Sequence, residues 1–201
     1  MDDHAIHRVP EALEAIHRDT RRLGFTMGSE PQTGALLRTL AASKPKGRFL
    51  ELGTGTGIGT AWLLAGMDRD STLDSVELDP KVLEVARLHL SRDSRVTFHQ
   101  ADGASFLAKP ARQEYDFVYA DSWPGKFTHL ELALSLVRAG GIYFIDDLLP
   151  QTSWPEGHAP KVPALIAELK KRDDFVSTQL CWASGLMILV RTQPQPSIPN
   201  P

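Results

Sequence analysis

The sequence is poor in cysteine, in long apolar runs and in charge of one sign. A single cysteine among 201 residues excludes an intrachain disulfide and a metal centre built from several thiolates. No apolar run approaches the roughly 18 residues of a membrane helix, and the first residues, MDDHAIHRVPEAL, lack the basic and apolar regions of a secretory signal. We therefore expect a cytoplasmic protein.

Charge and hydropathy point to an ordinary globular chain. The 25 acidic residues nearly balance 22 basic ones, so the formal net charge is −3. This balance gives no electrostatic reason to expect bulk binding to nucleic acid or to a membrane surface. With 42% hydrophobic residues, the chain can build one sizeable core, and we expect a single domain over residues 1–192. The Pro-rich segment 193–201 is predicted to be disordered.

Short apolar runs alternate with helical patterns along the chain. Strands are predicted at 47–52, 71–78, 95–100, 115–121 and 141–146. Helices are predicted at 10–24, 31–43, 57–67, 80–92, 104–108, 126–140 and 160–172, with Gly140 as the C-cap of the sixth. This alternation indicates a mostly parallel sheet. Two further strands within 175–191, joined by a turn at Ser184-Gly185, form a predicted hairpin, so at least one strand is antiparallel.

A glycine-rich loop follows the first predicted strand. The segment ELGTGTGIGT (51–60) places Gly53, Gly55 and Gly57 between a strand and a helix, where glycines allow a tight turn and close approach of a ligand to backbone N–H groups. Glu77 ends the next strand, in the position of an acid that accepts hydrogen bonds from a ribose. The glycine spacing differs from the G-x-G-x-x-G of dinucleotide sites, and Glu51 suits the ammonium of an amino-acid-bearing cofactor. A nicotinamide-dependent oxidoreductase is the alternative.

Five motifs, taken in order, resemble a known family. These are ELGTGTGIGT, VELDP, QADGASF, YDFVYADSWPGKF and GGIYFIDDLLPQ. They resemble class I S-adenosylmethionine-dependent methyltransferases, and among these the small bacterial O-methyltransferases related to catechol and caffeoyl-CoA O-methyltransferases. The resemblance covers roughly residues 24–190. It implies an α/β Rossmann-like fold with a seven-stranded, mostly parallel sheet, one antiparallel strand near the C-terminal edge, and helices on both faces. Two extra N-terminal helices (1–45) would cover the site.

The resemblance also implies a cofactor and an activity. The cofactor is S-adenosylmethionine, and the reaction is transfer of its methyl group to a hydroxyl of a small molecule. Relatives also methylate a modified tRNA nucleoside, and a cofactor-binding protein without catalysis is a further alternative. Dimerisation is common in the family, so the N-terminal helices are plausible homodimer contacts. The cofactor-binding residues carried over by position are Met27, Glu51, Gly53, Thr54, Gly55, Gly57, Glu77, Asp102, Gly103, Ala104 and Asp121. Asp102 has the alternative role of capping the helix at 104–108.

Three aspartates follow the fourth and fifth predicted strands. Asp121 matches a metal-binding position of metal-dependent relatives, and Asp146-Asp147 stands where the family pattern is Asp-Asn. Three carboxylates suit Mg²⁺ or another divalent cation, and without a cation they would repel one another and raise a pKa. The sequence therefore predicts either a metal at Asp121, Asp146 and Asp147, or direct contact of these acids with cofactor or a cationic substrate.

The remaining candidates surround these acids in the sequence. Asp121 and Lys126 are the predicted catalytic residues. Lys126 would act as the base or bind an anionic substrate group, and its alternative is a solvated lysine at the start of a helix. The long loop 147–160 is predicted to form part of the substrate wall. Trp123, Trp154 and His158 are the predicted substrate-binding side chains.

Overall fold

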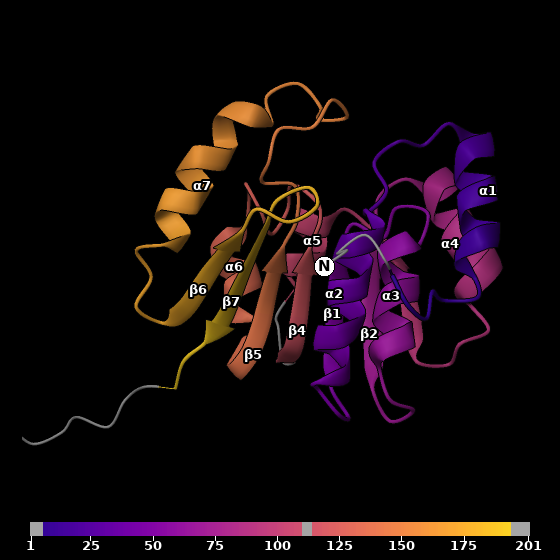
Figure 1. Cartoon of the computed structure of the whole chain (residues 1–201). Coiled ribbons are helices and arrows are strands. Elements are labelled where there is room, and N and C mark those ends of the chain that lie inside the picture. Colours follow the sequence, from indigo (N-terminus) through magenta and orange to yellow (C-terminus); the bar gives the residue numbers. More distant parts are fainter. Residues whose placement is uncertain (1–5, 110–113, 194–201) are drawn as a thin grey trace, which may run out of the picture.

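The computed structural model describes residues 6–109 and 114–193. Seven strands form one sheet in the order β3-β2-β1-β4-β5-β7-β6 (Figure 1). The strands are β1 (Arg48–Leu52), β2 (Thr72–Glu77), β3 (Val96–Gln100), β4 (Tyr115–Ala120), β5 (Val137–Ile145), β6 (Phe175–Leu180) and β7 (Leu186–Arg191). Among the described strands, β7 runs in the direction opposite to the other six. The predicted fold class is confirmed.

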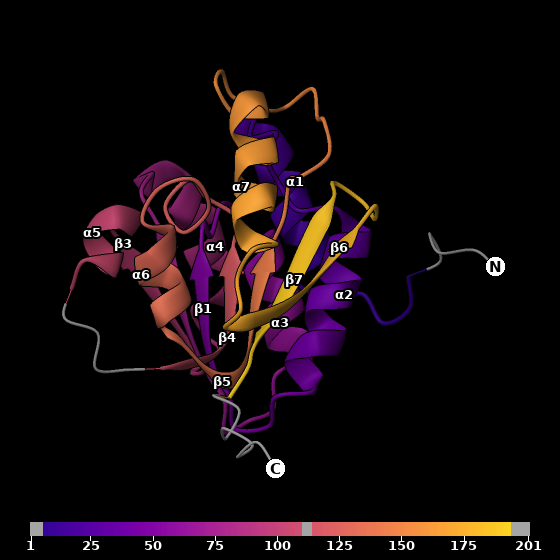
Figure 2. The same ribbon diagram turned by 90° about the vertical axis from the view of Figure 1, so that its left-hand side faces the viewer.

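Helices cover both faces of the sheet (Figures 1 and 2). They are α1 (Leu13–Leu23), α2 (Pro31–Ala42), α3 (Ile58–Gly66), α4 (Pro80–Leu90), α5 (Gly103–Leu107), α6 (Leu130–Ser135) and α7 (Val162–Leu169), with a 3-10 turn at Ala159–Lys161. One cluster of buried residues packs helices α1, α2, α3 and α4 against one face of the sheet. A second cluster packs α5, α6 and α7 against the other face. The two N-terminal helices therefore belong to the core of the domain.

Local sequence signals explain where several helices begin and end. Pro31 and Pro80 stand at the first positions of α2 and α4, where the missing proline N–H is not needed and the fixed φ suits a helix. Asp79 caps α4 by accepting a hydrogen bond from Lys81 N. Gly24 ends α1 with a left-handed φ of 73°. These boundaries confirm the predicted helices 10–24, 31–43 and 80–92 to within a few residues.

The predicted helix 126–140 is wrong. Only Leu130–Ser135 is helical, and strand β5 begins already at Val137. Val137 pairs with Tyr115 ahead of a register shift and is fully buried, so its side chain joins the sheet core through a bulged extension of the strand. Gly140, predicted as a helix C-cap, has a φ of 77° within this extension. The helical periodicity of the sequence continues past Ser135, but the packing of Val137 in the sheet overrides this local preference.

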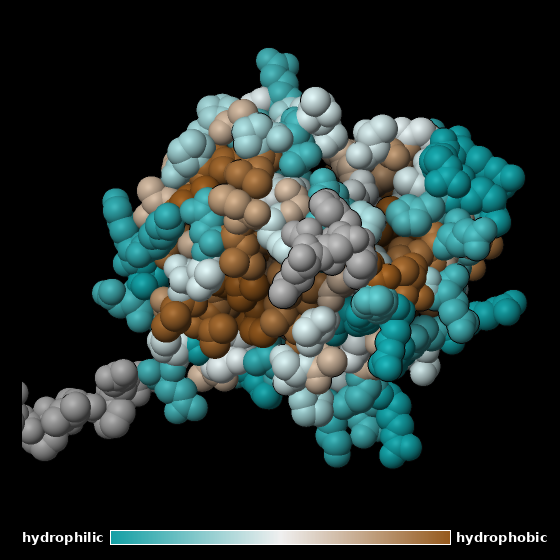
Figure 3. Space-filling view, viewed as in Figure 1, coloured by the Kyte–Doolittle hydropathy of each residue, from teal (hydrophilic) through white to brown (hydrophobic). Residues whose placement is uncertain are grey.

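The C-terminal hairpin is confirmed, although its loop is longer than predicted. Strands β6 and β7 pair in antiparallel register and are joined by residues 181–185 rather than by a two-residue turn. A Cβ on Gly185 would lie 2.4 Å from Leu149 N, so this loop packs closely on the segment that follows β5. Apolar surface gathers over β5 to β7, where Val176 and Val190 are exposed partners (Figure 3).

Two further predictions concern the C-terminal segment and membrane spans. The segment predicted to be disordered, 193–201, falls outside the described residues except for Gln193. Across residues 6–109 and 114–193, no helix is both long and apolar enough to pass through a bilayer.

Candidate functional site

Two adjoining cavities lie at the carboxyl ends of the central strands, where ligands of open α/β sheets bind. We call them the glycine-loop cavity, of about 320 Å³, and the acidic cavity, of about 490 Å³. They share five lining residues: Met27, Gly28, Ser29, Asp121 and Asp147. A ligand group bound at these shared residues would therefore be accessible from both cavities.

The glycine loop 53–57 shapes one cavity because its backbone adopts conformations that suit glycine. Gly53, Gly55 and Gly57 have φ values of 102°, 54° and 92°. A Cβ at Gly53 would lie 2.5 Å from the carbonyl oxygen of Asp121, and one at Gly57 would lie 2.9 Å from Ala86 Cβ. At Gly55 the nearest atom is Phe25 Cε1, at 3.4 Å. Close packing thus demands glycine at 53 and 57, whereas Gly55 has room for a side chain.

Glu77 fixes the loop and faces the same cavity. Its Oε2 accepts a hydrogen bond from Gly55 N at 2.9 Å, and its Oε1 accepts one from Asp79 N at 3.0 Å. Each carboxylate oxygen has a second lone pair for another donor. The acid that the sequence assigns to a ribose therefore lies at the cavity wall with acceptor capacity left.

Glu51 lies behind the loop rather than in the cavity lining. It is fully buried, and its Oε2 accepts hydrogen bonds from Ser75 and Thr60. Its Oε1 has no hydrogen-bond partner. Burial raises the pKa of Glu51 to about 7. A Cβ on Gly59, which lines the cavity, would lie 2.6 Å from Oε1, so this unpaired acceptor is separated from the cavity only by a glycine. The arrangement fits a donor such as an ammonium.

Asp102 caps a helix. It accepts hydrogen bonds from Ala104 N at 3.3 Å and Ser105 N at 3.1 Å at the start of α5. Asp102, Gly103 and Ala104 line neither cavity. The capping alternative is therefore observed, and a cofactor contact at these three residues stays a prediction.

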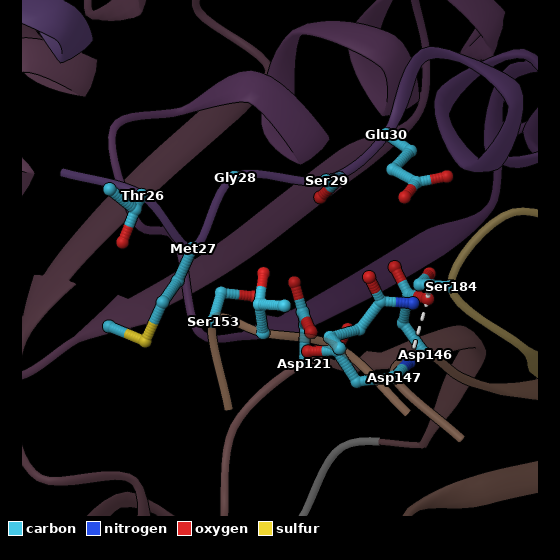
Figure 4. A pocket seen from close by; sticks show the side chains of 12 residues that line it. Thr26, Met27, Gly28, Ser29, Glu30, Asp121, Asp146, Asp147, Ser153 and Ser184 are labelled. Carbon is cyan, nitrogen blue, oxygen red and sulfur yellow. Dashed lines mark hydrogen bonds between the residues drawn. The ribbon is translucent and has the colours of Figure 1, made fainter. Parts of the chain in front are cut away.

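The acidic cavity is lined almost wholly by polar side chains (Figure 4). Its carboxylates are those of Glu30, Asp121, Asp146 and Asp147. Hydroxyl and amide groups come from Thr26, Ser29, Gln151, Thr152, Ser153 and Ser184. None of the described residues that line it is basic or aromatic, and Met27 is the only large apolar one. The lining suits polar, hydroxyl-bearing ligands better than flat aromatic ones.

A buried network connects two of these acids. The Tyr119 hydroxyl lies 3.1 Å from an oxygen of Asp121 and 3.1 Å from an oxygen of Asp146. Asp146 also accepts hydrogen bonds from Ser184 Oγ and from Asp147 N. Burial and the Asp147 charge raise the pKa of Asp146 to about 6. Burial raises the pKa of Asp121 well above its usual value, opposed by the nearby Lys126 ammonium.

Lys126 is buried, which corrects the alternative of a solvated lysine at a helix start. Its side chain is 2% exposed, and its Nζ lies 3.8 Å from Asp121 Oδ1. Because α6 begins only at Leu130, Lys126 belongs instead to a turn in which its N–H donates to Trp123 O. It lines the glycine-loop cavity.

The three predicted metal ligands line one cavity but are not arranged as a metal site. Among the described residues, no three His, Cys, Asp or Glu side chains are arranged to hold a metal ion. The Asp146 carboxylate accepts hydrogen bonds from Ser184, from Tyr119 and from the N–H of Asp147. The Lys126 ammonium lies beside Asp121. Asp147 has a left-handed backbone, with a φ of 62°. The donor set therefore does not fit a divalent ion.

The loop 147–160 forms one wall through an aromatic stack. Trp123 and His158 line the glycine-loop cavity, and His158 Nε2 lies 3.1 Å from Asp147 O. Trp154 stacks on His158 with ring centroids 4.3 Å apart and lines neither cavity. Trp154, predicted to contact substrate, thus packs against the His158 ring, whereas Trp123 and His158 themselves face a cavity.

Sequence reasoning missed Tyr119, Glu30 and Ser184. Tyr119 precedes Asp121 by two residues on a strand, so the alternation of side chains places both on one face, and this signal was available. Glu30 and Ser184 lie far from the motifs in sequence, and only the fold brings them to the acidic cavity.

Comparison with known proteins shows a similarity to methyltransferases. Residues 50–148 match a family model described as a methyltransferase domain. This segment of the chain is therefore similar to known methyltransferases. A Mycolicibacterium vanbaalenii methyltransferase named "Putative O-methyltransferase" is 29% identical over 69% of this chain and 64% of its own length. A Mycobacterium leprae relative of the same kind is 30% identical over 66% of this chain and 62% of its own length. The alignments thus span less than two thirds of these methyltransferases.

Solved methyltransferases share the fold over nearly the whole chain. TomG from Streptomyces achromogenes, an O-methyltransferase involved in tomaymycin synthesis and solved with SAM, superposes with a TM-score of 0.79 at 22% identity, covering 95% of this chain and 94% of TomG. An O-methyltransferase from Bacillus cereus, solved with SAH, gives a TM-score of 0.81 at 18% identity, with 94% of each chain covered. The likeness establishes the seven-stranded α/β fold for this chain.

Proposed function

We propose that this protein is an S-adenosylmethionine-dependent O-methyltransferase acting on a polar small molecule. The observation that carries the proposal is the pair of adjoining cavities, one walled by a glycine loop and the other by carboxylates and hydroxyls, with Asp121 at their shared wall. The match of residues 50–148 to a methyltransferase domain and the related structures with SAM and SAH support it.

The residues of the glycine-loop cavity fit this cofactor. Glu77 has free acceptor capacity for ribose hydroxyls. The unpaired Glu51 Oε1 beside Gly59 would receive the amino group, directly or through water. Gly53, Thr54, Gly55 and Met27 line the same space. Bound there, the cofactor supplies an activated methyl group.

The acidic cavity would hold the acceptor with its hydroxyl toward Asp121. As the new oxygen–carbon bond forms and the carbon–sulfur bond breaks, the hydroxyl proton passes to the Asp121 carboxylate. Burial raises the pKa of Asp121, which makes its carboxylate a better base at neutral pH. The Lys126 ammonium, 3.8 Å from Asp121, would stabilise negative charge that develops on the acceptor oxygen. Much of the rate would come from holding the oxygen in line with the methyl group.

The lining also discriminates among acceptors. Four carboxylates and no basic side chain, among the described residues of the acidic cavity, would repel the phosphates of a nucleic acid. This disfavours the tRNA nucleoside as acceptor. The glycine spacing and the buried Glu51 disfavour a nicotinamide dinucleotide. A cytoplasmic location and a homodimer through α1 and α2 complete the proposal.

The first test is calorimetric titration with S-adenosylmethionine and S-adenosylhomocysteine. We expect saturable binding of both, weakened ten- to a hundredfold in Glu77→Ala, because a hydrogen bond to a charged group contributes roughly 1.5–3 kcal/mol. The matched control is Glu84→Ala, an exposed carboxylate on α4. No heat with either ligand, or equal weakening in both variants, would contradict the proposal. Binding without methyl transfer to any hydroxylated compound would favour the non-catalytic alternative.

A further inference from the structure

We propose that the buried Lys126 is a built-in cation that takes the place of a divalent metal ion, so that methyl transfer here is metal-independent. The inference rests on the proposed function for its consequence, but the charge arrangement itself stands on the structure alone. The starting point is that three carboxylates share one cavity wall, yet their arrangement does not fit a metal ion.

The position of Lys126 is fixed by the turn that carries it. The turn that carries it is closed by backbone hydrogen bonds from Lys126, Phe127 and Thr128 to the carbonyl oxygen of Trp123. Gly125, with a φ of 89°, has no space for a Cβ, since Leu52 Cδ1 would lie 2.5 Å away. The buried Tyr143 hydroxyl donates to Gly125 O. The turn is therefore anchored to the core, and its fixed backbone holds the Lys126 side chain in a buried position.

Charge balance requires such a cation. A lysine that is 2% exposed needs a compensating charge, because burying an unpaired ammonium is very unfavourable. Its nearest carboxylate is Asp121, and Asp146 and Asp147 add negative charge beside it. Conversely, three acids that face one another need positive charge to stay ionised. Lysine and acids thus satisfy each other within one chain.

A divalent ion would compete poorly for the same place. Mg²⁺ requires near-octahedral oxygen ligands, whereas Asp146 is already held by Ser184, Tyr119 and Asp147 N. An ion next to Asp121 would also face the Lys126 ammonium and be repelled by it. The acid at 147, where the family pattern has Asn, adds one negative charge, and Lys126 offsets it.

The experiment titrates MgCl₂ and MnCl₂ into wild-type protein, Lys126→Met, Lys126→Arg and the control Lys161→Met, which removes an exposed lysine that lies over the Trp123 ring. Calorimetry reports binding, and thermal unfolding reports stability. We expect no saturable metal binding in the wild type, Lys126→Arg or Lys161→Met. We expect Lys126→Met to gain at least tenfold in Mn²⁺ affinity and to recover part of its lost stability when Mn²⁺ is added.

Stoichiometric metal uptake by the wild type, abolished by Asp121→Ala, would overturn the inference. So would a Lys126→Met variant that folds and shows no gain in metal affinity. If that variant does not fold, wild type and Lys126→Arg still decide, because both retain the cation. Cofactor titration of the wild type is run in parallel. Its failure would refute the proposed function while leaving the metal result valid.

Discussion

The two cavities are built in different ways. The glycine-loop cavity takes much of its wall from one continuous segment, 53–59, in which glycines alternate with other residues and fix the path of the backbone. The acidic cavity takes its wall from side chains of four separate segments, around residues 26–30, 121, 146–153 and 184. A wall made of backbone is tightly constrained by packing, whereas a wall made of side chains is open to change. The comparison teaches that cofactor and acceptor recognition should respond differently to substitution.

Gly53→Ala should have the largest effect. Its Cβ would meet the Asp121 carbonyl at 2.5 Å, and its φ of 102° is unfavourable for alanine. We expect a loss of about 3 kcal/mol or more in unfolding free energy, from strain and overpacking together, measured by urea denaturation. Gly24→Ala is the control, since its φ is also positive but its Cβ would meet nothing within 4 Å; it should lose only about 1–2 kcal/mol. Equal losses would mean that close packing does not constrain the loop.

Glu51→Gln should change how stability depends on pH. Burial raises the pKa of Glu51 from 4.5 to about 7, so between these values the folded chain holds a proton that the unfolded chain has released. The Glu51 contribution to stability therefore falls as pH rises toward 7 and levels off above it. Relative to wild type, the variant should gain roughly 3 kcal/mol between pH 4 and pH 8.

The measurement is urea denaturation across that pH range. Exposed Glu84→Gln is the control and should follow the wild-type curve at every pH. A Glu51→Gln curve parallel to the wild type would show that the buried carboxyl does not bind its proton preferentially in the fold.

Glu30→Gln should have the smallest effect, confined to the acceptor side. Glu30 lines only the acidic cavity and makes no capping hydrogen bond to α2, so the fold does not depend on its charge. We expect KM for a cationic or hydroxylated acceptor to rise about three- to tenfold, as for loss of one modest polar contact, with cofactor affinity unchanged. Glu14→Gln, exposed on α1, should change neither constant. A change in cofactor affinity would show that the two walls are not independent.

The same contrast explains what could be predicted from sequence. The glycines, Glu77 and the alternating strands obey local rules of backbone conformation and periodicity, so the sheet and one cavity were predictable. The burial of Lys126 was not, because the turn that carries it, closed onto the Trp123 carbonyl, lies ahead of α6, whereas the sequence pattern extended the helix back to residue 126. Glu30 and Ser184 reach the acidic cavity through packing between distant segments, for which a single sequence carries no local signal.

The left-handed backbone of Asp147 has an evolutionary consequence. Asparagine and aspartate are the side chains that best tolerate such a φ, apart from glycine, and their codons differ at a single nucleotide. Exchange between them would therefore alter the charge of the acceptor wall without rebuilding the chain around it. A position of this kind lets a lineage change the charge that faces its acceptor in one mutational step.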